Sequence, residues 1–84
     1  MTKNKPQNLS KEPQVEEMDL KGLEPPQPMV SIMAALEESP KGHHLRALLD
    51  RKPVYLIPLI EEAGHSYTIS QRDPETWVLL ITKA

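Results

Sequence analysis

The sequence predicts an α+β fold, a two-layer α/β sandwich in which both helices cover one face of a four-stranded mixed sheet. Length is the first observation, because 84 residues suffice for one small two-layer core. The second is hydrophobic periodicity, which follows a helix in some segments and a strand in others. Prolines and glycines separate these segments and give the order β-α-β-α-β-β.

Composition narrows the chemistry that the chain can perform. It contains no cysteine, which excludes disulfides, thiolate metal sites and thiol nucleophiles. No apolar run approaches the roughly 20 residues that span a bilayer, and no secretory signal begins the sequence. We therefore expect a cytoplasmic protein with no membrane part.

The chain divides near Gln14 into a basic tail and an acidic body. Residues 1–14 carry three lysines against one glutamate and two large apolar side chains, so we expect a disordered tail. Residues 15–84 form the domain and carry seven Lys and Arg against eleven Asp and Glu, a net charge of −4. This balance argues against nucleic acid as a partner.

The first half of the domain is predicted to contain a strand, a helix and a strand. Residues 15–20 form the first strand, and Gly22 ends it. Pro28 suits the first position of a helix that ends at Ser39. Residues 43–50 are rich in leucine, as is typical of an interior strand. The helix has its apolar face at Met29, Ile32, Met33 and Leu36.

The second helix is predicted from Pro53 to Ala63, with Gly64 as its C′ residue. Pro58 lies within that range, where a proline removes a hydrogen bond and clashes with the preceding turn. We therefore expect a kink, or an irregular first turn before a regular stretch from Leu59.

A hairpin completes the predicted fold. Its strands are residues 65–71 and 76–82, and residues 72–75 form the turn. The last strand is apolar on both sides, since Trp77, Leu79 and Ile81 alternate with Val78 and Leu80. One set must face away from the helices. We expect it to form an exposed apolar stripe for a partner protein or for self-association, in a monomer or weak homodimer.

The segment MDLKGLEPPQPMV at residues 18–30, followed by the Pro-Lys-Gly turn at residues 40–42, resembles the TusA/SirA-like family. The signature of these small bacterial proteins is a strand, Gly-Leu, one residue, and Cys-Pro-x-Pro at the start of the first helix. The resemblance covers nearly all of residues 15–84, and Ile57-Pro58 matches another family feature. It implies a sandwich like the C-terminal domain of translation initiation factor three.

The chain departs from this family at the residue that carries its chemistry. Sulfur carriers hold a persulfide on the motif cysteine, and Pro25 stands at that position here. Proline has no nucleophile, so sulfur transfer by this route is excluded. The sequence looks like a cysteine-free, uncharacterised branch of the family. We expect no enzyme activity and no cofactor.

One edge of the sheet carries a functional prediction. Ligands approach the carboxyl ends of parallel strands, where residues 22–28 and 50–53 form two loops. We expect the N-termini of the two helices to lie there close to two cations, Arg51 and Lys52. Such a site would attract a carboxylate, a phosphate or an acidic loop of a partner protein. The alternative is ordinary solvated charges, with Arg51 paired to Asp50. The candidate partner- or anion-binding residues are Glu24, Pro25, Gln27, Arg51 and Lys52.

Two classes of function remain. The favoured one is a non-catalytic protein-interaction or regulatory module with a protein partner. The other is a small-anion or metal-binding protein that uses Arg51, Lys52 or the histidines. His43 and His44 are neighbours in a predicted strand and point to opposite faces, so a metal site with His65 requires a tertiary coincidence.

Overall fold

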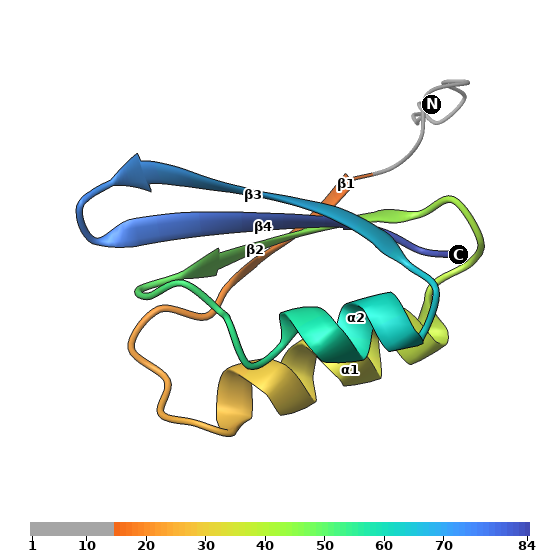
Figure 1. Ribbon diagram of the computed structural model, residues 1–84, viewed down its shortest axis with the longest axis horizontal. Coiled ribbons are helices and arrows are strands. Elements are labelled where there is room, and N and C mark those ends of the chain that lie inside the picture. The colour runs from red at the N-terminus through yellow and green to blue at the C-terminus, as the bar shows by residue number, and fades with distance from the viewer. Residues whose placement is uncertain (1–14) are drawn as a thin grey trace, which may run out of the picture.

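The computed structural model describes residues 15–84, so the predicted disorder of residues 1–14 lies outside the described residues. The predicted order of elements and the placement of both helices on one face are confirmed (Figure 1). Neither helix in this part is long and apolar enough to cross a membrane. The elements are β1 (Val15–Asp19), α1 (Gln27–Glu38), β2 (His44–Leu49), α2 (Ile57–Glu62), β3 (Ser66–Asp73) and β4 (Thr76–Thr82).

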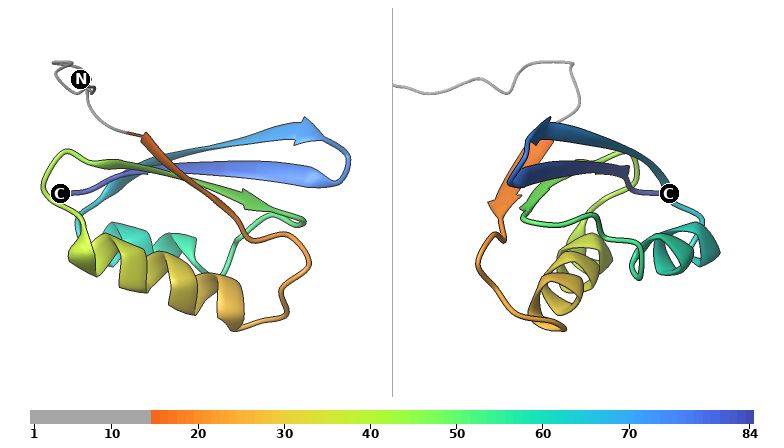
Figure 2. Two further views of the ribbon diagram at one scale, coloured as in Figure 1. Left: turned by 180° about the vertical axis from the view of Figure 1, so that it is seen from behind. Right: turned by 60° about the vertical axis from the view of Figure 1, so that its left-hand side comes forward.

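The four strands lie in the order β1-β2-β4-β3. Strand β1 is parallel to β2, whereas β4 is antiparallel to both of its neighbours. The leucine-rich strand β2 is therefore an interior strand, as predicted. Figure 2 shows that the sheet forms one layer and the two helices the other.

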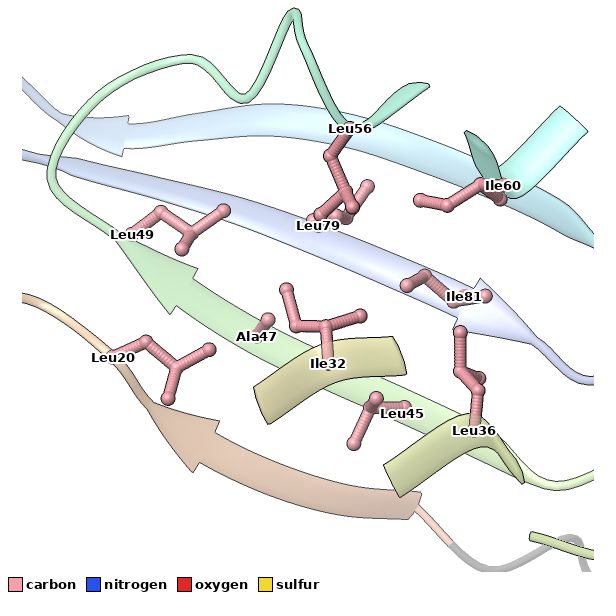
Figure 3. Packing of buried hydrophobic residues seen from close by; sticks show 10 residues of the cluster. All are labelled: Leu20, Ile32, Leu36, Leu45, Ala47, Leu49, Leu56, Ile60, Leu79 and Ile81. Carbon is pink, nitrogen blue, oxygen red and sulfur yellow. The ribbon is translucent and has the colours of Figure 1, made fainter. Parts of the chain in front are cut away.

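The core lies between these two layers (Figure 3). Ile32 and Leu36 of α1 and Ile60 of α2 have at most 2% of their surface exposed. They pack on alternate residues of the central strands, because alternate residues of a strand share one face. The buried cluster is Leu20, Ile32, Leu36, Leu45, Ala47, Leu49, Leu56, Ile60, Leu79 and Ile81.

Helix α1 begins one residue earlier than predicted. Pro26 is its N-cap and Gln27 its first residue, so Pro28 takes the second position. A proline is tolerated there because the first-turn amides have no partner within the helix. The predicted end at Ser39 is confirmed. Lys83 donates from Nζ to the carbonyls of Leu36 and Ser39, which caps the helix from the C-terminal end of the chain.

The prediction that Pro53 opens the second helix is wrong. Residues 54–56 form a turn, closed by the Leu56 amide on the Pro53 carbonyl at 3.0 Å, and α2 begins at Ile57. Pro58 thus lies at the start of the helix, where its missing N–H costs nothing. Of the two expectations for Pro58, an irregular turn does precede the helix, but the regular stretch begins at Ile57 rather than at Leu59. Helix α2 is consequently only six residues long.

The prediction of an exposed apolar stripe on β4 is also wrong. Val78 and Leu80 face away from the helices, but both are half-buried. Arg46 lies opposite Leu80 and pairs with Glu17. Lys21 reaches across β2 to donate to Thr76 Oγ1 at 3.2 Å. Polar side chains therefore crowd this face. The large exposed apolar residues are Val15, Leu23, Val30, Val54, Tyr55 and Leu59.

Leu79 and Leu80 offer a matched test of the two faces of β4. We expect Leu79→Ala, at a fully buried site, to lower the free energy of unfolding by about 2–5 kcal/mol. Leu80→Ala, at a half-buried site on the other face, should cost less than half as much. Urea unfolding monitored by circular dichroism measures both. Equal losses would show that the faces are wrongly assigned.

Candidate functional site

The loops that follow β1 and β2 lie at the same end of the molecule (Figures 1 and 2). This follows from the parallel pairing of the two strands, whose carboxyl ends share one edge. Asp50 ties the loops together, because its Oδ2 accepts the Gly22 N–H at 2.9 Å. Gly22 has φ = 88°, a left-handed conformation that glycine adopts without strain. The edge is thus held by a contact between residues far apart in sequence.

A groove of about 340 Å³ opens between the two loops. We call it the loop groove. Its walls are mainly apolar, and its two charged residues are both cations. The first loop and α1 contribute Pro25, Pro26 and Met29, and the second loop contributes Arg51, Lys52, Val54 and Tyr55.

The second loop presents its apolar side chains to solvent because it is anchored on both sides of them. Pro53 and Leu56 are fully buried. Between them, Val54 and Tyr55 are 62% and 41% exposed. Burial of the two anchors thus holds two apolar side chains outside the core, where they line the groove.

The structure brings together three of the five residues proposed from the sequence, namely Pro25, Arg51 and Lys52. Glu24 and Gln27 do not line the groove. Instead the Gln27 amide donates to the Glu24 carbonyl at 2.8 Å, which forms the turn into α1.

Sequence reasoning missed the other four lining residues. Met29 fits the apolar period of α1, which predicts a place in the core, and it does pack partly against the core. Val54 and Tyr55 fall in the range predicted as helix. The sequence signal that could have identified Val54 and Tyr55 as groove residues is their position directly after two cations and a proline. Pro26, the fourth, belongs to the family-like motif.

Both cations in the groove remain able to meet an anion. Arg51 Nε lies 3.9 Å from Asp50 Oδ1, and its side chain is 76% exposed. The predicted pairing with Asp50 is confirmed, but the distance is too long for a hydrogen bond and such exposed pairs contribute little. Lys52 Nζ lies 5.9 Å from the centroid of the Trp77 ring, a cation–π contact, and its N–H groups have no hydrogen-bond acceptor among residues 15–84.

The helix N-termini add less than predicted. In the first turn of α1 the Gln27 amide is already bonded, and Pro28 has no N–H. Helix α2 begins at Ile57 and is separated from Lys52 by the turn at residues 54–56. Of the two helix N-termini predicted to meet the cations, only that of α1 lies in the groove with Arg51 and Lys52, and the prediction is wrong for α2. The side chains of Arg51 and Lys52 carry the full positive charges of the groove.

The histidines have separate partners and form no common site. Among residues 15–84, no cluster of three or more His, Cys, Asp or Glu is placed to hold a metal ion. The observed contacts are His43 Nε2 with Glu16 Oε1 at 3.2 Å, His44 Nδ1 with Thr82 Oγ1 at 2.9 Å, and His65 Nδ1 with the Ala84 amide at 3.0 Å.

Two side chains of β3 have displaced pKa values with structural causes. The Tyr67 hydroxyl donates to Glu61, and this hydrogen bond raises the pKa of Tyr67. The Glu75 amide donates to Asp73 in the hairpin turn and lowers the pKa of Asp73. The first contact joins β3 to α2 and the second stabilises the turn, so both belong to the scaffold.

The Asp50–Gly22 contact can be tested by removing its acceptor. Asp50→Ala should lower the free energy of unfolding by about 1 kcal/mol, the usual net contribution of one hydrogen bond. It should also speed hydrogen exchange at the Gly22 amide, whereas exchange in β4 should change only with global stability. Amide exchange measured by NMR reports both. Unchanged protection of Gly22 would contradict the contact.

Comparison with solved structures supports the fold. A crystal structure of a SirA-like protein from Desulfitobacterium hafniense aligns with a TM-score of 0.71 and 21% sequence identity, over 81% of this chain and 95% of that chain. The predicted SirA-like fold is thereby confirmed. No curated protein matches the chain. The family described as "Uncharacterized conserved protein (DUF2249)" matches residues 17–83, nearly all of the described part. The chain therefore belongs to the DUF2249 family.

Proposed function

We propose that this protein is a non-catalytic interaction module that binds a protein partner through the loop groove. The observation that carries the proposal is the exposure of Val54 and Tyr55 beside Arg51 and Lys52, on an edge held by the Asp50–Gly22 contact. Exposed apolar side chains grouped with polar neighbours are typical of protein-binding surfaces.

The chemistry of the groove supports binding rather than catalysis. Its lining contains no carboxylate, histidine, serine or threonine. Pro25, at the position of the carrier cysteine in TusA/SirA-like proteins, contributes an apolar ring to the wall. A site with this lining can exclude water and attract negative charge, but it offers no carboxylate or imidazole that could act as a general base.

A small anion is the second candidate occupant, and Arg51 and Lys52 favour it. The other five lining residues do not favour a small anion, because they are apolar and an inorganic anion gains nothing from contact with them. Exposed cations are also screened by salt over a Debye length of about 8 Å. A protein segment gains from both the apolar and the charged parts of the groove.

Two exposed valines allow a matched test of the proposed function. Val54 is 62% exposed in the groove, whereas Val30 is 51% exposed on α1 and does not line it. We expect Val54→Glu to reduce partner capture from native cell extract at least about 10-fold, equivalent to 1.4 kcal/mol. Val30→Glu should leave capture within about two-fold of the parent.

Both substitutions are at exposed positions, so each should change the free energy of unfolding by about 0.5 kcal/mol or less. Quantitative mass spectrometry of the captured proteins compares the three chains. Capture that is unaffected by Val54→Glu, or lost equally with Val30→Glu, would count against the loop groove.

A further inference from the structure

The charge and shape of the loop groove also indicate the chemistry of its occupant. Resting on the proposed function, we infer that the groove binds an acidic segment of a partner protein, in which an aliphatic or aromatic side chain stands beside carboxylates. The apolar side chain lies against the proline and methionine wall, and the carboxylates meet Arg51 and Lys52.

The apolar part of the groove is suited to one side chain of a partner. Its volume of about 340 Å³ is near the lower limit for small-ligand pockets, which range over about 300–1,000 Å³. Such pockets bury about 70–90% of their ligand. Here Val54 and Tyr55 are themselves 62% and 41% exposed, so the groove is open to solvent on the side of the second loop. A segment that continues beyond the groove suits this opening.

Charge complementarity selects an acidic segment. Residues 15–84 have a net charge of −4, so the cationic groove is a local reversal of the charge of the body. Elsewhere in the described chain, Lys21, Arg46 and Lys83 contact Thr76, Glu17 and the end of α1, and the exposed Lys41 and Arg72 lie outside the groove. The donors of Arg51 have no acceptor within hydrogen-bonding distance among residues 15–84. A guanidinium of this kind can hold a carboxylate in bidentate geometry.

The same charge argues against the tail of this chain as the occupant. Residues 1–14 carry Lys3, Lys5 and Lys11 against Glu12, and this net positive charge has the same sign as the groove. A second copy of the acidic body is a different occupant, which the experiment must separate from a partner segment.

The groove is also preorganised, which favours binding of a short segment. Pro25, Pro26 and Pro53 restrict the backbone of the two loops, and the Asp50–Gly22 contact holds the loops together. Little conformational entropy is therefore lost at the groove when a segment binds.

Three short peptides can test this inference on the full chain. Each is an N-acetylated, C-amidated pentapeptide: one has leucine flanked by aspartates, one has asparagines in place of the aspartates, and one has glycine in place of the leucine. We expect the leucine–aspartate peptide to bind at least about 10-fold more tightly than either of the others. Chemical-shift changes should concentrate at residues 25–29 and 51–56. Trp77 emission should change because Lys52 lies over its ring.

A matched pair of charge variants tests the role of the two cations. Arg51→Gln with Lys52→Gln removes both charges from the groove, whereas Lys41→Gln with Arg72→Gln removes the same number from exposed positions outside it. We expect the first double variant to lose at least about 10-fold in affinity for the acidic peptide. The second should lose less than about two-fold.

Several outcomes would overturn the inference. These are equal binding of the asparagine peptide, equal loss in the two double variants, or displacement of the peptide by inorganic phosphate at similar concentration. Shifts that depend on protein concentration, with self-association seen by analytical ultracentrifugation, would assign the groove to a second copy.

Failure of the peptides is distinguishable from failure of the proposed function. If no peptide binds while Val54→Glu alone still abolishes capture, the chemistry of the occupant is wrong and the groove remains the docking surface. If the peptides fail and Val54→Glu has no effect either, both proposals are wrong.

Discussion

Parallel pairing between β1 and β2 is the interaction on which the rest of the structure depends. It places the carboxyl ends of both strands, and hence both of the loops that follow them, at one edge of the sheet. It also makes β2 an interior strand, so that Leu45, Ala47 and Leu49 can meet the helices. The core and the loop groove therefore have a common origin.

Prolines determine what kind of site that edge becomes. Pro28 lies in the first turn of α1, where it replaces an N–H group that an anion would otherwise meet. Pro25 and Pro26 supply apolar rings to the groove. An edge that is a favourable place for a backbone anion site in other α/β sheets becomes an apolar surface here, and Arg51 and Lys52 supply its positive charge. This is the physical basis for expecting binding of a protein segment.

Exposure of apolar residues distinguishes the two surfaces considered for a partner. On the open face of the sheet, Lys21 reaches Thr76 and Arg46 lies opposite Leu80, and both Val78 and Leu80 are half-buried. In the second loop, by contrast, Pro53 and Leu56 are buried and Val54 and Tyr55 are exposed. Apolar residues are therefore half-buried on the open face of β4 and exposed in the second loop, because their surroundings in the folded chain differ.

By itself the sequence determined the order of the six elements, the bounds of β4 and two charged members of the groove, because periodicity and loop position are local properties. Tertiary structure decided the strand order, the late start of α2 and the lining of the groove. Tertiary structure also brought Lys21 to Thr76 of β4, a contact between residues 55 positions apart in the sequence. It joined the two loops through the contact between Asp50 and Gly22, which are 28 positions apart. Such contacts form only when distant segments pack together, and local periodicity carries no record of them.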